Sequence, residues 1–216
     1  MKNFKEKVAV ITGAGSGMGR YLAVLLAKDG ADVCVCDVNE ETLNETVAML
    51  RKYNVSVSSH LLDVSDKESI EALPQKVIDQ HGKVDLVFNN AGVTTGAHFK
   101  DMDENNWDWV MGINFDGVVN STRAFIPHLI NNSEAAIVNT SSIFGMVAVP
   151  GQTVYHATKF AVRGFTESLA LEMKQTNPNL QIHCVHPGHI GTNIAATARM
   201  SDEDFESTQP RSSIFT

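Results

Sequence analysis

The chain has 216 residues, of which 43% are hydrophobic and 19% charged, and its formal net charge at pH 7 is −8. This size and composition suit one globular domain with its own core. The acidic balance excludes nucleic acid as a principal partner, because phosphate binding requires a basic surface, and no apolar run reaches the about 20 residues of a membrane span.

The N-terminal apolar run, Val8–Thr12, leads into a glycine-rich turn and has no small-residue cleavage site, so it predicts a β-strand and not a signal peptide. Among the three cysteines, Cys34 and Cys36 lie two positions apart on a predicted strand, and Cys184 lies far away in the sequence. Two residues at that spacing form a disulfide poorly. We therefore expect free, buried thiols and a cytoplasmic location.

Short β-branched runs alternate with longer segments of helical periodicity. Strands are predicted at Val8–Thr12, Asp32–Val38, Ser56–Val64, Asp85–Asn89, Ala136–Thr140 and Gln181–His186. Helices are predicted at Ser16–Asp29, Glu40–Lys52, Lys67–Gln80, Glu104–Ile130 (one long helix or a broken pair) and Tyr155–Gln175. Strands that are apolar throughout are buried on both faces, and alternation with helices implies right-handed parallel crossovers. The sequence thus predicts a doubly wound, Rossmann-like α/β domain with a parallel sheet.

The turn between the first strand and the first helix reads TGAGSGMG, from Thr12 to Gly19. Glycines permit a tight turn and bring backbone N–H groups close to a pyrophosphate at the helix N-terminus, where the helix dipole also favours an anion. A merely flexible loop is the alternative. The position of this turn between a predicted strand and a predicted helix is the context that dinucleotide binding requires.

Asp37 ends the second predicted strand, 18 residues beyond Gly19. A carboxylate there accepts hydrogen bonds from the adenosine ribose hydroxyls and repels a 2′-phosphate. Ser16, Val38 and Asn39 supply no positive charge to offset that repulsion. The sequence therefore favours NAD over NADP, against the alternative that Asp37 only forms a turn at the strand end.

The stretch from Asn139 to Lys159 contains Ser142, Tyr155 and Lys159. On a helix, Tyr155 and Lys159 stand one turn apart on one face, so the ammonium is expected to lower the pKa of the phenol toward neutrality. Ser142, 13 residues before Tyr155, can face it across a cleft and bond the same substrate oxygen. A tyrosine and a lysine at this spacing also occur by chance on helix surfaces, so the interpretation depends on the accompanying motifs.

From Lys7 to Thr192 the chain resembles the classical short-chain dehydrogenase/reductase family. The resemblance rests on TGAGSGMG (Thr12–Gly19), Asp63 with Val64, NNAG (Asn89–Gly92), Asn114, Ser142, Tyr155 with Lys159, and PGHIGT (Pro187–Thr192), in that order. It implies hydride transfer between a nicotinamide cofactor and a carbonyl or secondary alcohol.

The resemblance also assigns roles to individual residues. Tyr155 would be the general acid or base, Ser142 would polarise the substrate oxygen, and Lys159 would bind the nicotinamide ribose. Asn114 would help to hold a water in a proton relay with Lys159, or alternatively cap or bridge backbone. The implied cofactor-binding residues are Gly13, Gly15, Ser16, Gly17, Met18, Gly19, Asp37, Asp63, Val64, Asn90, Ala91, Gly92, Tyr155, Lys159, Pro187, Gly188, Ile190 and Thr192.

Side chains expected by resemblance to face the substrate are mostly small or apolar. They are Thr94, Thr95, Phe144, Met146, Val147, Gly151 and Gln152. An apolar slot suggests a lipid, steroid or acyl substrate. The resemblance further implies a homodimer or homotetramer. We place the dinucleotide-binding and catalytic domain at residues 1–192, and residues 193–216 begin a truncated or flexible substrate-loop region that lacks the final edge strand of the family.

A metal site is not predicted, although His183, Cys184, His186 and His189 lie near the last strand. Alternate strand positions point to opposite faces, so these donors diverge. His156, next to Tyr155, points off the catalytic face and is expected to pack or to lie in an interface.

Three other functions fit the same fold class. A nucleotide-sensing or scaffold protein would have an eroded catalytic set, whereas Ser142, Tyr155 and Lys159 are all present. A methyltransferase would lack the tyrosine and lysine pair. A sugar-nucleotide epimerase would space the glycines of the first turn differently.

Overall fold

The computed structural model describes residues 3–188, 190–191, 194 and 198–200. Within them, six parallel strands form one sheet in the order β3-β2-β1-β4-β6-β7. The strands are β1 (Val8–Thr12), β2 (Asp32–Asp37), β3 (Val57–Leu61), β4 (Leu86–Asn89), β6 (Ala135–Thr140) and β7 (Leu180–Val185). The order reverses direction at β1 and β4, which is the topological switch point where doubly wound sheets bind ligands.

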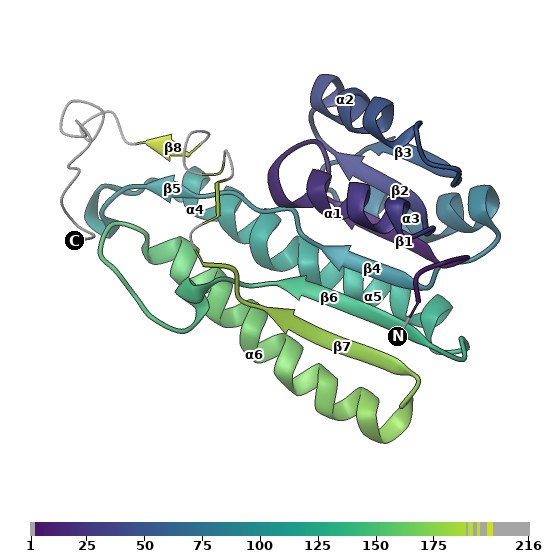
Figure 1. Cartoon of the computed structure of the whole chain (residues 1–216). Helices are drawn as coiled ribbons and strands as arrows, with labels where there is room; N and C mark the ends of the chain where they lie inside the picture. Colours follow the sequence, from purple (N-terminus) through teal and green to yellow (C-terminus); the bar gives the residue numbers. More distant parts are fainter. Residues whose placement is uncertain (1–2, 189, 192–193, 195–197, 201–216) are drawn as a thin grey trace.

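Helices cover both faces of this sheet (Figure 1). The helices are α1 (Gly17–Lys28), α2 (Glu40–Leu50), α3 (Lys67–His81), α4 (Glu104–Met111), α5 (Gly117–Leu129) and α6 (Thr153–Thr176). Successive strand residues enter opposite cores: Val10 packs with side chains of α3 and α5, whereas Ile11 packs with those of α1 and α2. Burial on both faces explains why the central strands are apolar throughout.

Short polar residues precede and cap three of the helices that do not follow the glycine-rich turn. The side chains of Asn39, Asp66 and Asp103 accept hydrogen bonds from the backbone N–H groups of Thr42, Ser69 and Asn106. Each interaction satisfies a donor that the first helical turn leaves unpaired. Ser16, which precedes α1, makes no such side-chain bond, so the helix that follows the glycine turn keeps its N–H groups available.

The predicted strands and helices are present, with ends that coincide or differ by at most three residues, and the doubly wound α/β prediction is confirmed. The segment 104–130 forms the broken pair that the sequence allowed, in which the π-helical turn η2 (Gly112–Asp116) joins α4 directly to α5. The sequence did not predict the short parallel pair β5 (Thr95–Gly96) and β8 (Arg199–Met200). No helix in the described part of the chain has the length and apolarity to cross a bilayer.

Candidate active site

The motifs of the sequence converge at the carboxyl edge of the sheet. The arrows of β4, β6 and β7 all point toward the side of the molecule where β5 and β8 lie (Figure 1). The glycine turn follows β1, the NNAG motif ends β4, Ser142 follows β6, and Pro187 follows β7. Parallel strands bring their carboxyl ends to one edge, so segments distant in the sequence form one site.

The glycine turn is fixed by close backbone contacts. Gly13 and Gly17 have positive φ angles of 64° and 49°. A Cβ added to Gly13 would lie 2.8 Å from the Cα of Ala91, and one added to Gly19 would collide with the carbonyl oxygen of Gly13. The turn is therefore a close-packed cradle and not a flexible loop, with the amino end of α1 open toward an anion.

Gly19→Ala is expected to weaken NADH binding by at least about ten-fold and to destabilise the protein by about 1–3 kcal/mol, because the added methyl group must displace the Gly13 carbonyl. Nicotinamide fluorescence titration and urea unfolding measure the two effects. Gly164→Ala on α6, where an added Cβ meets no atom within 4 Å, is the control and should leave both quantities unchanged or improve stability slightly. Equal NADH affinities in Gly19→Ala and Gly164→Ala would contradict the role of the glycine turn in binding the cofactor.

Asp37 ties the glycine turn to the end of β2. Its Oδ2 accepts from the backbone N–H of Gly15 at 2.8 Å, and its Oδ1 accepts from that of Asn39 at 3.0 Å. Arg20 braces the same turn, since its Nη2 donates to the carbonyl oxygens of Gly15 and Thr42 and forms an ion pair with Glu45. The turn-forming role of Asp37 is therefore real, and the half-buried carboxylate keeps further acceptor positions for a ribose.

The end of β4 is bonded to the same turn through Thr12. The Thr12 hydroxyl oxygen accepts from the N–H groups of Asn90 and Ala91 at 3.0 and 3.1 Å, and the Asn90 side chain donates to the Thr12 carbonyl at 2.9 Å. The sequence motif contained Thr12, but its role as a link between two strands could not be inferred. Asn90 and Ala91 thus hold the end of β4 against the start of the glycine turn.

Asp63 and Val64 follow β3 farther out along the same edge. Asp63 is exposed and its Oδ1 accepts from the backbone and hydroxyl of Ser65. Val64 is buried in a core and lies within contact of a Cβ added at Gly117. Their contact with an adenine remains a prediction, and Val64 contributes to packing in addition.

Ser142, Tyr155 and Lys159 meet as expected. Ser142, directly after β6, is buried and its Oγ accepts from the Phe144 N–H at 3.1 Å. Tyr155 and Lys159 stand on α6, with the Lys159 Nζ 5.5 Å from the centre of the Tyr155 ring. The Nζ donates to the Thr140 carbonyl at 2.9 Å, so the end of β6 fixes the ammonium beneath the phenol.

The pKa values of this group differ from the sequence-based expectation. Burial raises the pKa of Tyr155 above 10, and its hydrogen bond with Ser142 offsets only part of the increase. Burial also lowers the pKa of Lys159 from 10.5 to about 8. The expectation that the pKa of Tyr155 falls toward neutrality is not met in the protein alone, because burial disfavours the phenolate and is the largest influence on this group.

Asn114 lies in the π-helical turn η2 and is fully buried. Its Oδ1 accepts from the Val93 N–H at 2.8 Å, while its Nδ2 donates to the Val93 carbonyl at 2.9 Å and to the Thr158 hydroxyl at 3.2 Å. The side chain therefore bridges backbone, as the alternative interpretation proposed. The part of Asn114 in a water relay remains a prediction.

The carboxyl end of β7 completes the edge. The Pro187 carbonyl accepts from the Ile143 N–H at 3.0 Å, and Ile190 is exposed. Gly92 lies close to Asn114 and Lys159, since an added Cβ would lie 3.3 Å from the Asn114 Oδ1 and 3.5 Å from the Lys159 Nζ. Thr192 and His189 lie outside the described residues. Among those described, no group of three or more histidine, cysteine, aspartate or glutamate residues has a geometry that could hold a metal ion.

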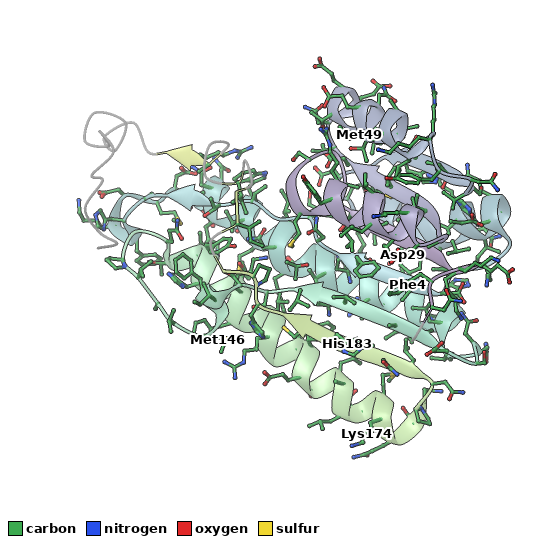
Figure 2. All side chains as sticks on the ribbon, viewed as in Figure 1. Phe4, Asp29, Met49, Met146, Lys174 and His183 are labelled. Carbon is green, nitrogen blue, oxygen red and sulfur yellow. The ribbon has the colours of Figure 1, made fainter. Side chains whose placement is uncertain are left out.

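Exposed apolar side chains, here called the apolar rim, follow Ser142 in the sequence. Ile143, Met146, Val147 and Val149 are each 41–52% exposed, and Figure 2 shows Met146 near the end of α6 opposite to Lys174. Thr94 and Thr95 are buried, and their contact with a substrate remains a prediction. The segment that contains them is joined to the start of α6, because Ala97 donates its N–H to the Gly151 carbonyl at 3.2 Å.

All three cysteines are free, as expected, but Cys184 is only partly buried. Cys34 and Cys36 are buried with their sulfur atoms 4.0 Å apart. Their pair lies within the core between the sheet and α3, and Cys36 directly precedes Asp37 at the carboxyl end of β2, where its carbonyl accepts from the Ala14 N–H.

Comparison with known proteins gives a consistent result. Residues 7–203 match the family model described as short chain dehydrogenase. A Mycobacterium tuberculosis protein that carries the name oxidoreductase SadH is 42% identical over 208 residues, which cover 96% of this chain and 75% of that protein. The 3-oxoacyl-[acyl-carrier-protein] reductase FabG of Thermotoga maritima is 37% identical over 86% of this chain and 75% of its own.

Solved structures agree with the sequence comparisons. The structure of a short chain dehydrogenase/reductase from Burkholderia phymatum in complex with NAD has a TM-score of 0.88 and 37% identity, and the match covers 98% of this chain and 73% of that one. Because the matched region covers nearly the whole chain, it includes both the glycine turn and the catalytic segment. The family model and this similarity, together with the converging site, establish that the chain belongs to the short-chain dehydrogenase family.

Proposed function

We propose that this oxidoreductase interconverts a secondary alcohol and a ketone, with Tyr155 as general acid and base and NAD as the preferred cofactor. The observation that carries the proposal is the convergence of Ser142, Tyr155 and Lys159 beside the glycine cradle. Ser142 hydrogen-bonds the Tyr155 hydroxyl, so a substrate oxygen placed between them meets two polar groups. Tyr155 would exchange its proton with that oxygen, and Ser142 would hold the oxygen in place.

The residues present fit a dinucleotide. At Gly13, Gly15 and Gly19 an added Cβ would run into protein atoms, so the turn keeps its tight course only with glycine there, and the amino end of α1 follows it without a side-chain cap. When bound, the nicotinamide supplies or accepts the hydride at the substrate carbon. Lys159 would donate to the nicotinamide ribose from its fixed place beside Gly92.

The preference for NAD over NADP follows from charge near the ribose. Asp37 places a carboxylate at the end of β2, and Arg20, the cation of the adjoining helix, is already engaged by Glu45 and two carbonyl oxygens. A 2′-phosphate would meet repulsion there without a free counter-charge. The NAD complex of the Burkholderia phymatum protein supports the same preference.

Titration with NADH and NADPH tests this preference. Wild-type protein is expected to bind NADH at least about ten-fold more tightly, and Asp37→Asn is expected to narrow the ratio by about ten-fold, or about 1.4 kcal/mol. Asparagine keeps an oxygen for the Gly15 N–H but offers no second acceptor for the Asn39 N–H, so urea unfolding of the variant is measured alongside to separate a disturbed turn from the lost charge. Glu40→Gln, at an exposed position of α2, is the control. Tighter NADPH binding by the wild type would refute the role of Asp37.

The substrate proposed is an alcohol or ketone with an extended apolar part, of lipid, steroid or acyl type. The exposed rim formed by Ile143, Met146, Val147 and Val149 gives such a part a surface to cover. The name of the Thermotoga maritima relative, a 3-oxoacyl reductase, favours the acyl class among the three. A panel of hydroxyacyl and oxoacyl compounds of increasing length tests it, and a rise of kcat/KM with chain length is the expected result.

We also propose that the protein forms a homodimer or homotetramer. Phe160 and Leu171 on α6 are 44% and 65% exposed, and such apolar side chains on a long helix suit a contact between subunits.

A further inference from the structure

The segment 144–149, which begins within η3 (Ile143–Gly145) and leads toward α6, carries most of the apolar rim. Met146, Val147 and Val149 are all exposed, whereas Gly145 is buried and lies close to the Lys159 backbone. A single side chain of α6 bonds both ends of the segment. That side chain is His156, the residue directly after Tyr155.

His156 binds both ends of the segment. Its Nε2 accepts from the Val149 N–H at 3.0 Å, and its Nδ1 lies 3.0 Å from the Phe144 carbonyl oxygen. Because Nε2 accepts, the ring proton resides on Nδ1, which donates to Phe144. The ring is 7% exposed. The expectation that His156 packs is therefore incomplete, since both ring nitrogens fix backbone.

Phe144 connects this clamp to the catalytic pair. Its N–H donates to the Ser142 Oγ at 3.1 Å, and its ring lies edge-on to the Tyr155 ring with centroids 6.3 Å apart. The same ring contacts the His156 ring with centroids 4.8 Å apart. One residue thus touches both groups that meet the substrate oxygen, and His156 holds that residue by its carbonyl and its ring.

We propose that His156 is a positioning residue, which clamps the segment 144–149 to α6 and so orients Ser142, Tyr155 and the apolar rim toward the substrate. The role rests on the proposed function, in which Ser142 and Tyr155 bind the substrate oxygen. His156 does not touch the reacting atoms. It acts through Phe144 at the catalytic end and through Val149 at the rim.

Hydrogen exchange of the full chain tests the clamp without a substrate. In His156→Ala, peptides that cover 144–152 are expected to exchange at least about ten-fold faster than in the wild type, because the Val149 N–H loses its acceptor. His156→Gln keeps an oxygen near the Nε2 position and should retain most of the protection. His183→Ala, at an exposed position of β7 (Figure 2), is the matched control. Unchanged exchange in His156→Ala would overturn the clamp.

Kinetics with a long-chain 3-hydroxyacyl thioester and NAD test the consequence for substrate. His156→Ala is expected to raise KM by about ten-fold with a smaller change in kcat, and to leave NADH affinity unaltered, since the rim and not the cradle is released. His156→Gln should lie within about three-fold of the wild type. Equal damage in both variants, or a loss of NADH affinity, would show a general structural role and refute positioning.

The two levels of the proposal fail in different ways. If the wild type does not turn over any hydroxyacyl compound, or if Tyr155→Phe remains active, the proposed function fails while the exchange result still decides the clamp. If the wild type is active and Tyr155→Phe is not, a KM unchanged in His156→Ala refutes the positioning role alone.

Discussion

Tyr155→Phe is expected to lower kcat/KM by about 10³-fold, the size of effect that a positioned proton donor contributes. Phenylalanine keeps the ring and its edge contact with Phe144, so the site should hold its shape. NADH affinity and the urea midpoint are expected to stay within error of the wild type. Steady-state assays with NAD and an alcohol substrate, alongside nicotinamide fluorescence, measure these quantities.

Tyr21→Phe removes a hydroxyl from a tyrosine that is 73% exposed on α1 and provides the control, with full activity expected.

The raised pKa of Tyr155 predicts a pH dependence that differs between the two reaction directions. The Tyr155 phenol is protonated at neutral pH and can donate its proton in ketone reduction. Alcohol oxidation requires that the phenol has first lost this proton. Oxidation by the wild type should therefore accelerate with rising pH while reduction does not. Turnover retained by Tyr155→Phe would eliminate the proposed mechanism.

Lys159→Met is expected to abolish most activity and at the same time to stabilise the protein. Burial lowers the pKa of Lys159 from 10.5 to about 8, which corresponds to a cost of about 3 kcal/mol for keeping the ammonium in the folded protein. Methionine removes this cost but leaves the Thr140 carbonyl without its donor, a loss of about 1 kcal/mol. The free energy of unfolding at pH 7 should rise by about 2 kcal/mol.

The pH dependence gives the sign of this effect. Below pH 8 the lysine is charged in both states, and the full cost is present. Between pH 8 and 10.5 the unfolded chain binds a proton that the folded chain has released, so the stability of the wild type gains relative to the variant. The advantage of Lys159→Met should therefore shrink across this range in urea unfolding.

Lys174→Met, an exposed change near the end of the same helix (Figure 2), serves as the control and should alter stability by less than about 0.5 kcal/mol. A Lys159→Met variant less stable than the wild type at pH 7 would show that the buried ammonium is a net stabilising group. An active Lys159→Met variant would show that the reaction does not require Lys159.

The fold was accessible from sequence because its signals are local. A run such as Val8–Thr12 is apolar at every position since both of its faces are buried, and capping residues such as Asn39 and Asp66 begin the helices that follow. The π-helical turn that joins the two helices within 104–129 could not be predicted from the sequence. The π-helical turn at Asn114 depends on bonds to Val93 and Thr158, which lie 21 and 44 residues away.

The site was predicted as a set of residues, but not as a set of contacts. Spacing placed Tyr155 and Lys159 on one helical face, where they are found. It could not show that burial governs both of their pKa values, because desolvation depends on everything packed around a group. Thr12, Arg20 and His156 were missed as linking residues, since each acts by bonds to backbone atoms of other segments.

By itself, the sequence determined the alternation of strands and helices, the glycine turn and the order of the motifs, because backbone propensity and burial pattern act over a few neighbouring residues. Only the tertiary structure decided which groups meet at the carboxyl edge, how the Asn114 side chain is used, and how His156 holds Phe144 beside Ser142 and Tyr155. Those contacts join elements that only the folded sheet brings together, and their energies depend on the burial that folding creates.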